Sequence, residues 1–320
     1  MNYRKLLSLV VFIPMLCGWQ SAVAITANDL ADIVEQMELA ISDISVEYEW
    51  LTVPPLTNKE GESQMGVEVL IPKDGCRTFN LHTAGLLNIV DPNTKGEGTP
   101  ERFLLEESTV LVTKDGNSWL NMTKQSYNGQ IGKYLNIGGW PEKMCEGAVI
   151  QTKPFVVGNG TPLGFSVFRC VYDSDKVPLS ARLRKIPLVR IDNTIQKVNG
   201  FNTIRADFLQ QFTKHICRRI CFSVDHGYTP VKFDYMTCTK PEYNKVSLSF
   251  IVQSLSKIGE NLWFPTSGII SKSGSNKVDM YQATGSVIIN QGLATTDFDI
   301  DFPVGTKVHD KIQDREYTVK

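Results

Sequence analysis

The second half of the sequence constrains the fold most, because strand-like stretches and short turns alternate from residue 188 to residue 291. Turn-forming residues such as Asn199-Gly200, Gly259-Glu260 and 273–276 separate the stretches. None of these connections is long enough to hold a crossover helix, so neighbouring strands must run antiparallel. We therefore expect an antiparallel sheet built from residues 188–198, 203–211, 215–224, 229–237, 245–258, 261–271 and 278–291.

An amphipathic helix is predicted over residues 27–43, with apolar side chains at spacings of three, four and seven and acidic residues on the other side. The pattern changes to strict alternation over residues 45–50, which is typical of a half-buried strand. We expect the helix to lie against the concave face of the sheet, with its apolar stripe facing the inward side chains of this strand. The residues expected there are Leu30, Ile33, Val34, Met37, Ile41, Val46, Tyr48, Trp50 and, from a later hairpin, Trp119.

The region between these two parts has weaker patterns. Asp115-Gly116 lies between two strand-like runs and predicts a hairpin over residues 109–124. The polar stretch 56–66 and the stretch 91–101, which is rich in Gly and Pro, are predicted as loops. A short helix is predicted over residues 177–183.

The N-terminal segment has the three parts of a secretory signal peptide. Arg4 and Lys5 precede an apolar run over residues 6–16, and Ala22-Val23-Ala24 follows as a cleavage pattern. We expect residues 1–24 to be removed and the mature chain to lie outside the cytoplasm; the alternative is an uncleaved membrane anchor. Lipidation of Cys17 is rejected because no small residue precedes it.

Cleavage leaves an even number of cysteines in an oxidising compartment, which favours disulfides. Cys217 and Cys221 lie four apart on a predicted strand, too far for a bond to each other. With a bulge or a small register shift, Cys217 would face Cys238, so we expect this bridge and a second one from Cys221 to Cys76, Cys145 or Cys170. The alternatives are free buried thiols, or a metal site from His215, Cys217 and Cys221, whose spacing does not match a standard zinc pattern.

Composition and motifs exclude several classes of function. Lys and Arg number 33 against 34 Asp and Glu, so a net charge of −1 gives no electrostatic reason to bind nucleic acid. The chain has no G-x-S-x-G or H-E-x-x-H motif, and residues 129–133 are too short for a phosphate-binding loop. His226 is interpreted as a solvated turn residue. We predict no enzyme activity, catalytic residue, metal or cofactor, with a hydrolase of dispersed residues as an alternative.

Several segments resemble, in the same order, the outer-membrane lipoprotein-sorting carrier superfamily that includes LolA, LolB and RseB. The first is the sequence over residues 44–50 after an amphipathic helix. The others are Val198-Asn199-Gly200, residues 225–232, 262–266, 298–310 and 317–319. The match covers the two ends of the mature chain and its second half, whereas residues 55–185 match poorly apart from the Asp115-Gly116 hairpin.

The resemblance implies a mostly β, α+β fold: a strongly curved, unclosed antiparallel β-barrel with helices packed on the concave side. It implies one domain over residues 25–320, with insertions around 55–185. The implied function is a periplasmic carrier or sensor that holds the acyl chains of a lipoprotein or lipid in an apolar cavity between the sheet and the helix over residues 27–43. The residues named above for the helix and the strands would line this cavity, and a membrane-bound protein is a further partner. The alternative is a regulatory or interaction module of the same fold whose core is filled by its own side chains.

Overall fold

The structure is a computed structural model dominated by one large β-sheet. It describes residues 24–53, 59–72, 76–89, 101–114, 117–126, 147–151, 166–168, 177–185, 187–237, 245–275, 278–299, 302 and 304–320. The helices are α1 (Ala27–Leu39), α2 (Leu179–Leu183) and the short 3₁₀ turns η5 (Val224–His226) and η6 (Thr295–Phe298). The strands are β1 (Ile44–Val53), β2 (Lys59–Ile71), β3 (Cys76–Ile89), β4 (Glu101–Lys114), β5 (Asn117–Ser126), β6 (Gly147–Gln151), β7 (Val189–Val198), β8 (Phe201–Leu209), β9 (Ile216–Ser223), β10 (Thr229–Met236), β11 (Val246–Gly259), β12 (Leu262–Lys272), β13 (Val278–Ala283), β14 (Ile288–Ile289), β15 (Lys307–Asp310) and β16 (Arg315–Thr318).

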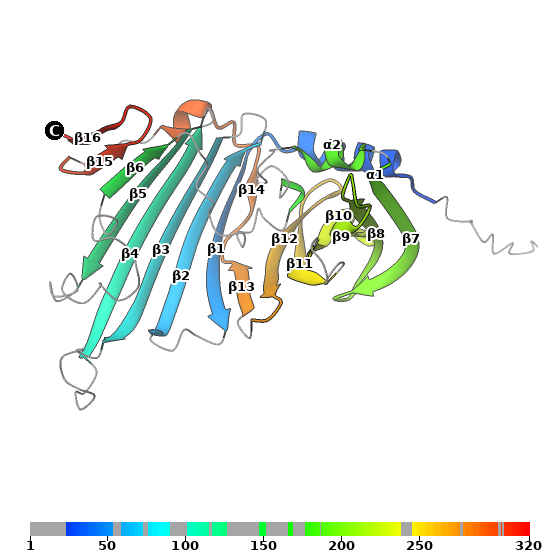
Figure 1. Cartoon of the computed structure of the whole chain (residues 1–320), viewed down its shortest axis with the longest axis horizontal. Helices are drawn as coiled ribbons and strands as arrows, with labels where there is room; N and C mark the ends of the chain where they lie inside the picture. The colour runs from blue at the N-terminus through cyan, green and yellow to red at the C-terminus, as the bar shows by residue number, and fades with distance from the viewer. Residues whose placement is uncertain are drawn as a thin grey trace, which may run out of the picture.

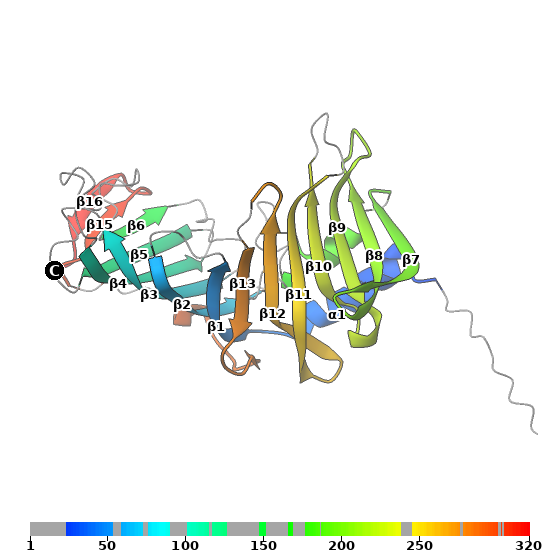
Figure 2. The ribbon, with the colours of Figure 1, turned by 90° about the horizontal axis from the view of Figure 1, so that it is seen from below.

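The sheet is unclosed, with β16 at one end and β7 at the other (Figure 1). Its strand order is β16-β15-β6-β5-β4-β3-β2-β1-β13-β12-β11-β10-β9-β8-β7, and β14 pairs with β1 outside this path. The described pairs are antiparallel except β6 with β15, which is parallel. The β7–β12 part is curved, and α1 lies behind it in the view of Figure 2.

The predicted antiparallel meander is confirmed in β7 to β13. The last predicted stretch, residues 278–291, is divided into β13 and β14, which both pair with β1. The predicted hairpin of residues 109–124 corresponds to β4 and β5, although Asp115-Gly116 itself lies outside the described residues. The short helix predicted at 177–183 is α2.

The loop predicted over residues 56–66 is wrong, because β2 already begins at Lys59. Its composition is polar, but its backbone pairs with β1 on one side and β3 on the other. Strand formation there depends on the partners that the fold supplies rather than on local propensity. Of the loop predicted over residues 91–101, residues 91–100 lie outside the described part of the chain, and Glu101 is the first residue of β4.

A capping box fixes the start of helix α1. Thr26 Oγ1 accepts from the backbone N–H of Asp29 at 3.2 Å, and Asp29 Oδ2 accepts from the N–H of Thr26 at 2.9 Å. The helix ends at Leu39, earlier than the predicted Asp43. Asn290 accounts for this ending, because its Nδ2 donates to Ala40 O at 2.9 Å and its Oδ1 accepts from the N–H of Ser42 at 2.7 Å.

Asp43 fixes the junction between α1 and β1. It is almost fully buried, and its carboxylate accepts the backbone N–H groups of Gln291, Gly292 and Leu293 at 2.8, 3.0 and 3.3 Å. Burial opposes ionisation, but these donors outweigh it and hold the pKa of Asp43 below its ordinary value. Asp43, which directly precedes β1, is thereby joined to residues 291–293, which follow β14.

We expect Asp43→Asn to lower the free energy of unfolding at neutral pH by about 2 kcal/mol, because an amide NH₂ would face backbone donors. The stability that Asp43 contributes is present above its unfolded pKa of about 4 and is lost as pH falls through the lower folded pKa. Urea denaturation at several pH values should therefore show the wild type approaching the variant in acid. Asp314→Asn, at an exposed turn, serves as the control and should change little; a pH-independent deficit in Asp43→Asn would contradict the assignment.

Candidate functional site

The two faces of the β7–β13 part of the sheet differ sharply in chemistry. On the face toward α1, buried apolar side chains from the sheet and the helices form one cluster, which we call the inner layer. Its sheet side carries large aromatic residues, and its helix side carries aliphatic ones. The inner layer contains Leu30, Ala31, Val34, Met37, Ile41, Ile44, Val46, Leu70, Val167, Phe168, Leu179, Leu183, Ile204, Ala206, Ile220, Phe222, Val231, Phe233, Phe250, Val252, Phe264, Ile270 and Tyr281.

The structure gathers most of the predicted cavity residues at this layer. From α1 and the segment after it, Leu30, Val34, Met37 and Ile41 are buried in it, and Ile33 packs against it half-buried. From β1, Val46 is buried in the layer, Trp50 packs against it half-buried, and Tyr48 is buried across from Gly66 of β2. These positions follow from the helical stripe and the strand alternation, and their use as a ligand cavity remains a prediction.

Trp119 is the predicted cavity residue whose strand does not border the inner layer. It lies on β5, which β2, β3 and β4 separate from β1. Its backbone pairs with Val112 and Ile150, and its side chain lies outside the described residues. Val112 belongs to a second, smaller cluster with Ile71 and Phe298.

Polar contacts join α1 to α2. Arg184, just after α2, donates through Nη2 to Asp32 Oδ1 and Glu35 Oε2, both at 2.7 Å. Ser180 donates its N–H to Glu38 Oε1 at 3.2 Å and its hydroxyl to Glu38 Oε2. Burial raises the pKa of Glu38, which these hydrogen bonds only partly offset. The acidic side of α1 is therefore where α2 binds, and the sequence carries no signal of this pairing.

The start of α1 is held to the free edge of the sheet. Ile25 N donates to Asn193 Oδ1 at 3.1 Å, and Asn193 Nδ2 donates to Ile25 O at 3.1 Å. The side chain of Ile25 packs against the inner layer. Together with Asn290 and Asp43, these contacts hold α1 through polar groups at both ends, while apolar packing holds its middle.

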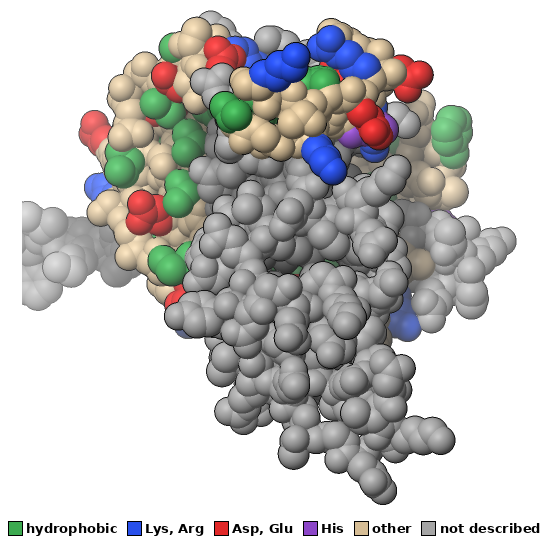
Figure 3. Space-filling view, turned by 90° about the vertical axis from the view of Figure 1, so that its left-hand side faces the viewer, with side chains coloured by type: hydrophobic (Ala, Val, Ile, Leu, Met, Phe, Trp, Pro, Cys, Tyr) green, Lys and Arg blue, Asp and Glu red, His purple; other side chains and the backbone are tan. Residues whose placement is uncertain are grey.

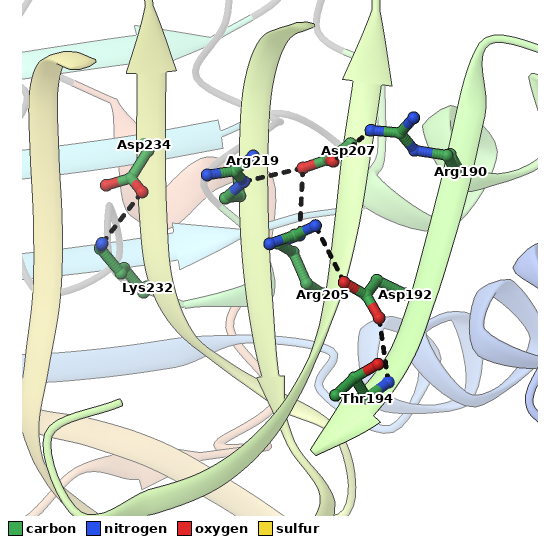
Figure 4. A network of polar contacts seen from close by, with 8 residues as sticks. All are labelled: Arg190, Asp192, Thr194, Arg205, Asp207, Arg219, Lys232 and Asp234. Atoms are coloured by element: carbon green, nitrogen blue, oxygen red, sulfur yellow. Dashed lines mark hydrogen bonds and ion pairs between the residues drawn. The ribbon is translucent and has the colours of Figure 1, made fainter. Parts of the chain in front are cut away.

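The opposite face of β7–β10 carries a network of charged residues that the sequence analysis missed (Figure 4). The strand register places Arg190, Asp207, Arg219 and Asp234 side by side on successive strands. Asp207 is almost fully buried beneath the arginines, and its oxygens lie 2.9 Å from Arg190 Nη2 and 2.8 Å from Arg219 Nε. Burial opposes the charge of Arg219, but Asp207 outweighs it and raises the pKa of that guanidinium. Alternating charges directly opposite one another stabilise neighbouring strands.

A parallel row completes this network. Arg205 Nη2 lies 2.9 Å from Asp192 Oδ2, and Lys232 Nζ lies 3.0 Å from Asp234 Oδ2. Ser249 donates its hydroxyl to the other Asp234 oxygen at 2.6 Å. Cys221 is opposite Arg205 and Lys232, but burial raises the pKa of its thiol to about 11. At neutral pH this thiol is protonated and is a poor nucleophile and metal ligand.

The sequence interpretation of His226 as a solvated turn residue is wrong. Its ring is half-buried between Phe201 and Trp263, in edge-to-face contacts at 5.4 and 4.6 Å between ring centroids. Its Nδ1 lies 2.8 Å from Ser223 Oγ. This serine–histidine pair does not form a nucleophile, because Ser223 is fully buried; it closes the turn between β9 and β10.

Of the cysteine predictions, the structure tests only the placement of Cys217 and Cys221 on one strand, which is confirmed. Cys217 and Cys221 both lie on β9, and Cys217 Sγ lies 3.3 Å from Phe208 O where the register with β8 shifts. Three of the proposed partners, Cys145, Cys170 and Cys238, lie outside the described residues, and the side chain of Cys76 is not described. Both pairings therefore remain predictions. Among the described residues, no group of three or more His, Cys, Asp and Glu could hold a metal ion. Within the same part of the chain, no helix is long and apolar enough to cross a membrane.

Comparison with known proteins finds similarity in solved structures. No family model and no curated protein sequence matches the chain. A DUF1329 family protein from Desulfovibrio piger is 10% identical, with a TM-score of 0.43 over 85% of this chain and 95% of that one. An outer membrane lipoprotein-sorting protein domain from Vibrio parahaemolyticus is 10% identical, with a TM-score of 0.41 over 86% and 97%. A LolA superfamily protein from Nitrosomonas europaea is 9% identical, with a TM-score of 0.40 over 87% and 99%. These similarities concern the fold and assign no function to this chain.

Proposed function

We propose that this chain is a periplasmic binding protein, carrier or sensor, for the acyl chains of a lipoprotein or lipid. The inner layer between α1 and the sheet carries this proposal, because it presents apolar side chains on both sides, aromatic from the sheet and aliphatic from the helix. An acyl chain leaving water gains about 0.8 kcal/mol per CH₂ when it enters such an environment. One domain over residues 25–320, secreted through a cleaved leader, is part of the same proposal.

Entry of a ligand requires α1 to move. Leu30 and Val34 of α1 are fully buried against the sheet. An acyl chain would therefore take the place of the helix stripe on the phenylalanines of the sheet. This movement would break the ion pairs from Arg184 to Asp32 and Glu35, and it would leave the sheet face as the concave wall of the cavity.

The tight packing of the same residues supports the second candidate function, an interaction module with a filled core. Met37, at 6%, is the most exposed of the α1 residues in the inner layer. In this alternative the helix never leaves the sheet, and binding takes place on an outer surface. A hydrolase is the weaker alternative, since the Ser223–His226 contact buries its serine.

The two candidates differ in what remains bound after purification. Protein secreted from a bacterial host, extracted with organic solvent and analysed by mass spectrometry, should carry a stoichiometric acylated molecule if the first is correct. Absence of lipid, together with no binding of a fluorescent fatty acid, would favour the filled-core module and overturn the carrier proposal.

The contact between α1 and α2 allows a second test of the carrier proposal, by a substitution that weakens the contact without removing the helix. We expect Arg184→Gln to increase the rate of fluorescent fatty acid binding severalfold, because it removes the ion pairs from α2 to Asp32 and Glu35. Stopped-flow fluorescence would measure this rate. Lys185→Gln is the matched control, since Lys185 is the next residue and is exposed. An equal change in both variants would contradict a specific role for the contact between the helices.

A further inference from the structure

The turn between β8 and β9 exposes an aromatic side chain. Phe212 is 88% exposed, more than any other large hydrophobic side chain in the described chain. The turn around it is closed by two backbone hydrogen bonds, from Gln210 N to His215 O and from Lys214 N to Gln210 O, both 2.9 Å. Its hairpin projects beyond the strands at the upper edge of Figure 2. The turn itself therefore holds Phe212 in solvent.

Neighbouring strands bring basic residues to the same end of the sheet. The end of β10 meets the start of β11, where Thr237 N donates to Lys245 O at 2.8 Å. The end of β12 lies beside them, because Lys272 pairs with Leu248 of β11. We call the described residues at this end, 209–218, 236–237, 245–247 and 271–275, the Phe212 rim. Its charged residues are all basic: Lys214, Arg218, Lys245 and Lys272.

Two other ends of the sheet carry acidic residues. At the opposite ends of these strands, the turns contain Asp225 and Glu260. At the far end of the sheet, both acidic and basic side chains lie around β15 and β16 (Figure 3), where His309 Nδ1 lies 2.8 Å from Glu316 Oε1 and Arg315 Nε lies 3.6 Å from Asp310 Oδ2. The Phe212 rim differs from these two ends, because its described charged residues are all basic and it carries an exposed aromatic ring.

We propose that the Phe212 rim docks onto an anionic phospholipid bilayer. Trp, Phe and Leu side chains of surface-bound segments are buried at the boundary between headgroups and acyl chains, and Lys and Arg are attracted to anionic headgroups. Phe212 inserts among the headgroups, while Lys214 and Lys272, both exposed, lie beside them. A protein partner is less suitable, because a specific interface needs an apolar core that one protruding ring does not supply. This docking is independent of the inner layer and of any ligand held there.

Vesicle flotation tests the proposal directly. Purified protein whose N-terminus has been established as Ile25 is mixed with vesicles of phosphatidylcholine alone or with an equal part of phosphatidylglycerol, because an uncleaved apolar leader would itself bind lipid. We expect binding to the anionic vesicles, weak binding to the neutral ones and release at high salt. Phe212→Ser should lower the binding constant at least about tenfold, and Lys214→Gln or Lys272→Gln about fivefold each.

Leu39→Ser is the matched control, because Leu39 is also highly exposed but lies at the end of α1. It should leave vesicle binding unchanged, and all four variants should melt with the wild type because the altered side chains are exposed. No binding to anionic vesicles, equal binding to both vesicle types, or equal losses in Phe212→Ser and Leu39→Ser would each overturn the proposal. A failure of lipid extraction to find a bound acyl chain would leave this result untouched, so the two proposals fail separately.

Discussion

Met37→Asp is expected to lower the free energy of unfolding by about 4 kcal/mol, the largest effect that we predict for a single change. Met37 is buried in the inner layer, where the structure places apolar side chains from both the helix and the sheet. The substitution loses the transfer free energy of the methionine and places a carboxylate without a partner against an apolar wall. Urea denaturation followed by circular dichroism would measure the change, and any variant that remains folded should not bind a fluorescent fatty acid.

Leu39→Asp provides the matched control on the same helix. Leu39 is 78% exposed at the last position of α1, so the same change of chemistry meets water instead of the sheet. A carboxylate at a helix C-terminus is unfavourable by at most about 1 kcal/mol. If Met37→Asp and Leu39→Asp unfolded at the same urea concentration, α1 would not pack against the sheet as the structure has it.

Gly66→Ala is expected to lower the free energy of unfolding by about 3 kcal/mol through steric overlap. Gly66 of β2 pairs directly with Tyr48 of β1, and the Tyr48 ring lies over it. A Cβ at position 66 would lie 2.3 Å from the nearest ring carbon. The ring cannot rotate away into solvent, because Tyr48 is 1% exposed. Thermal unfolding of the variant should therefore occur well below that of the wild type.

A double-mutant cycle separates this overlap from a general intolerance of β2 to substitution. Tyr48→Val should itself destabilise the protein, because it leaves a cavity where the ring was. Gly66→Ala should cost much less in the Tyr48→Val background, since the added methyl group then occupies that cavity. Additive effects of the two changes would show that the ring does not cover Gly66.

The strands of the second half could be predicted from the sequence because their signals are local. Side-chain alternation selects the buried face of a strand, and turn residues such as Asn199-Gly200 mark where it ends. The stripe on α1 works in the same way, so Leu30, Val34 and Met37 were assigned to the buried face correctly. These patterns also located the inner layer, since one apolar face of a helix must cover one apolar face of a sheet.

Only the tertiary structure decided which elements pair and in what register. The polar segment of β2 becomes a strand because β1 and β3 supply its backbone partners, and Gly66 matters because the register places it opposite Tyr48. Arg184 reaches the acids of α1 from a distant part of the chain. The network around Asp207 likewise depends on three strands aligning their charges. Periodicity within a segment records which face is buried, whereas contacts between segments depend on the geometry of the whole fold, and no local pattern encodes it.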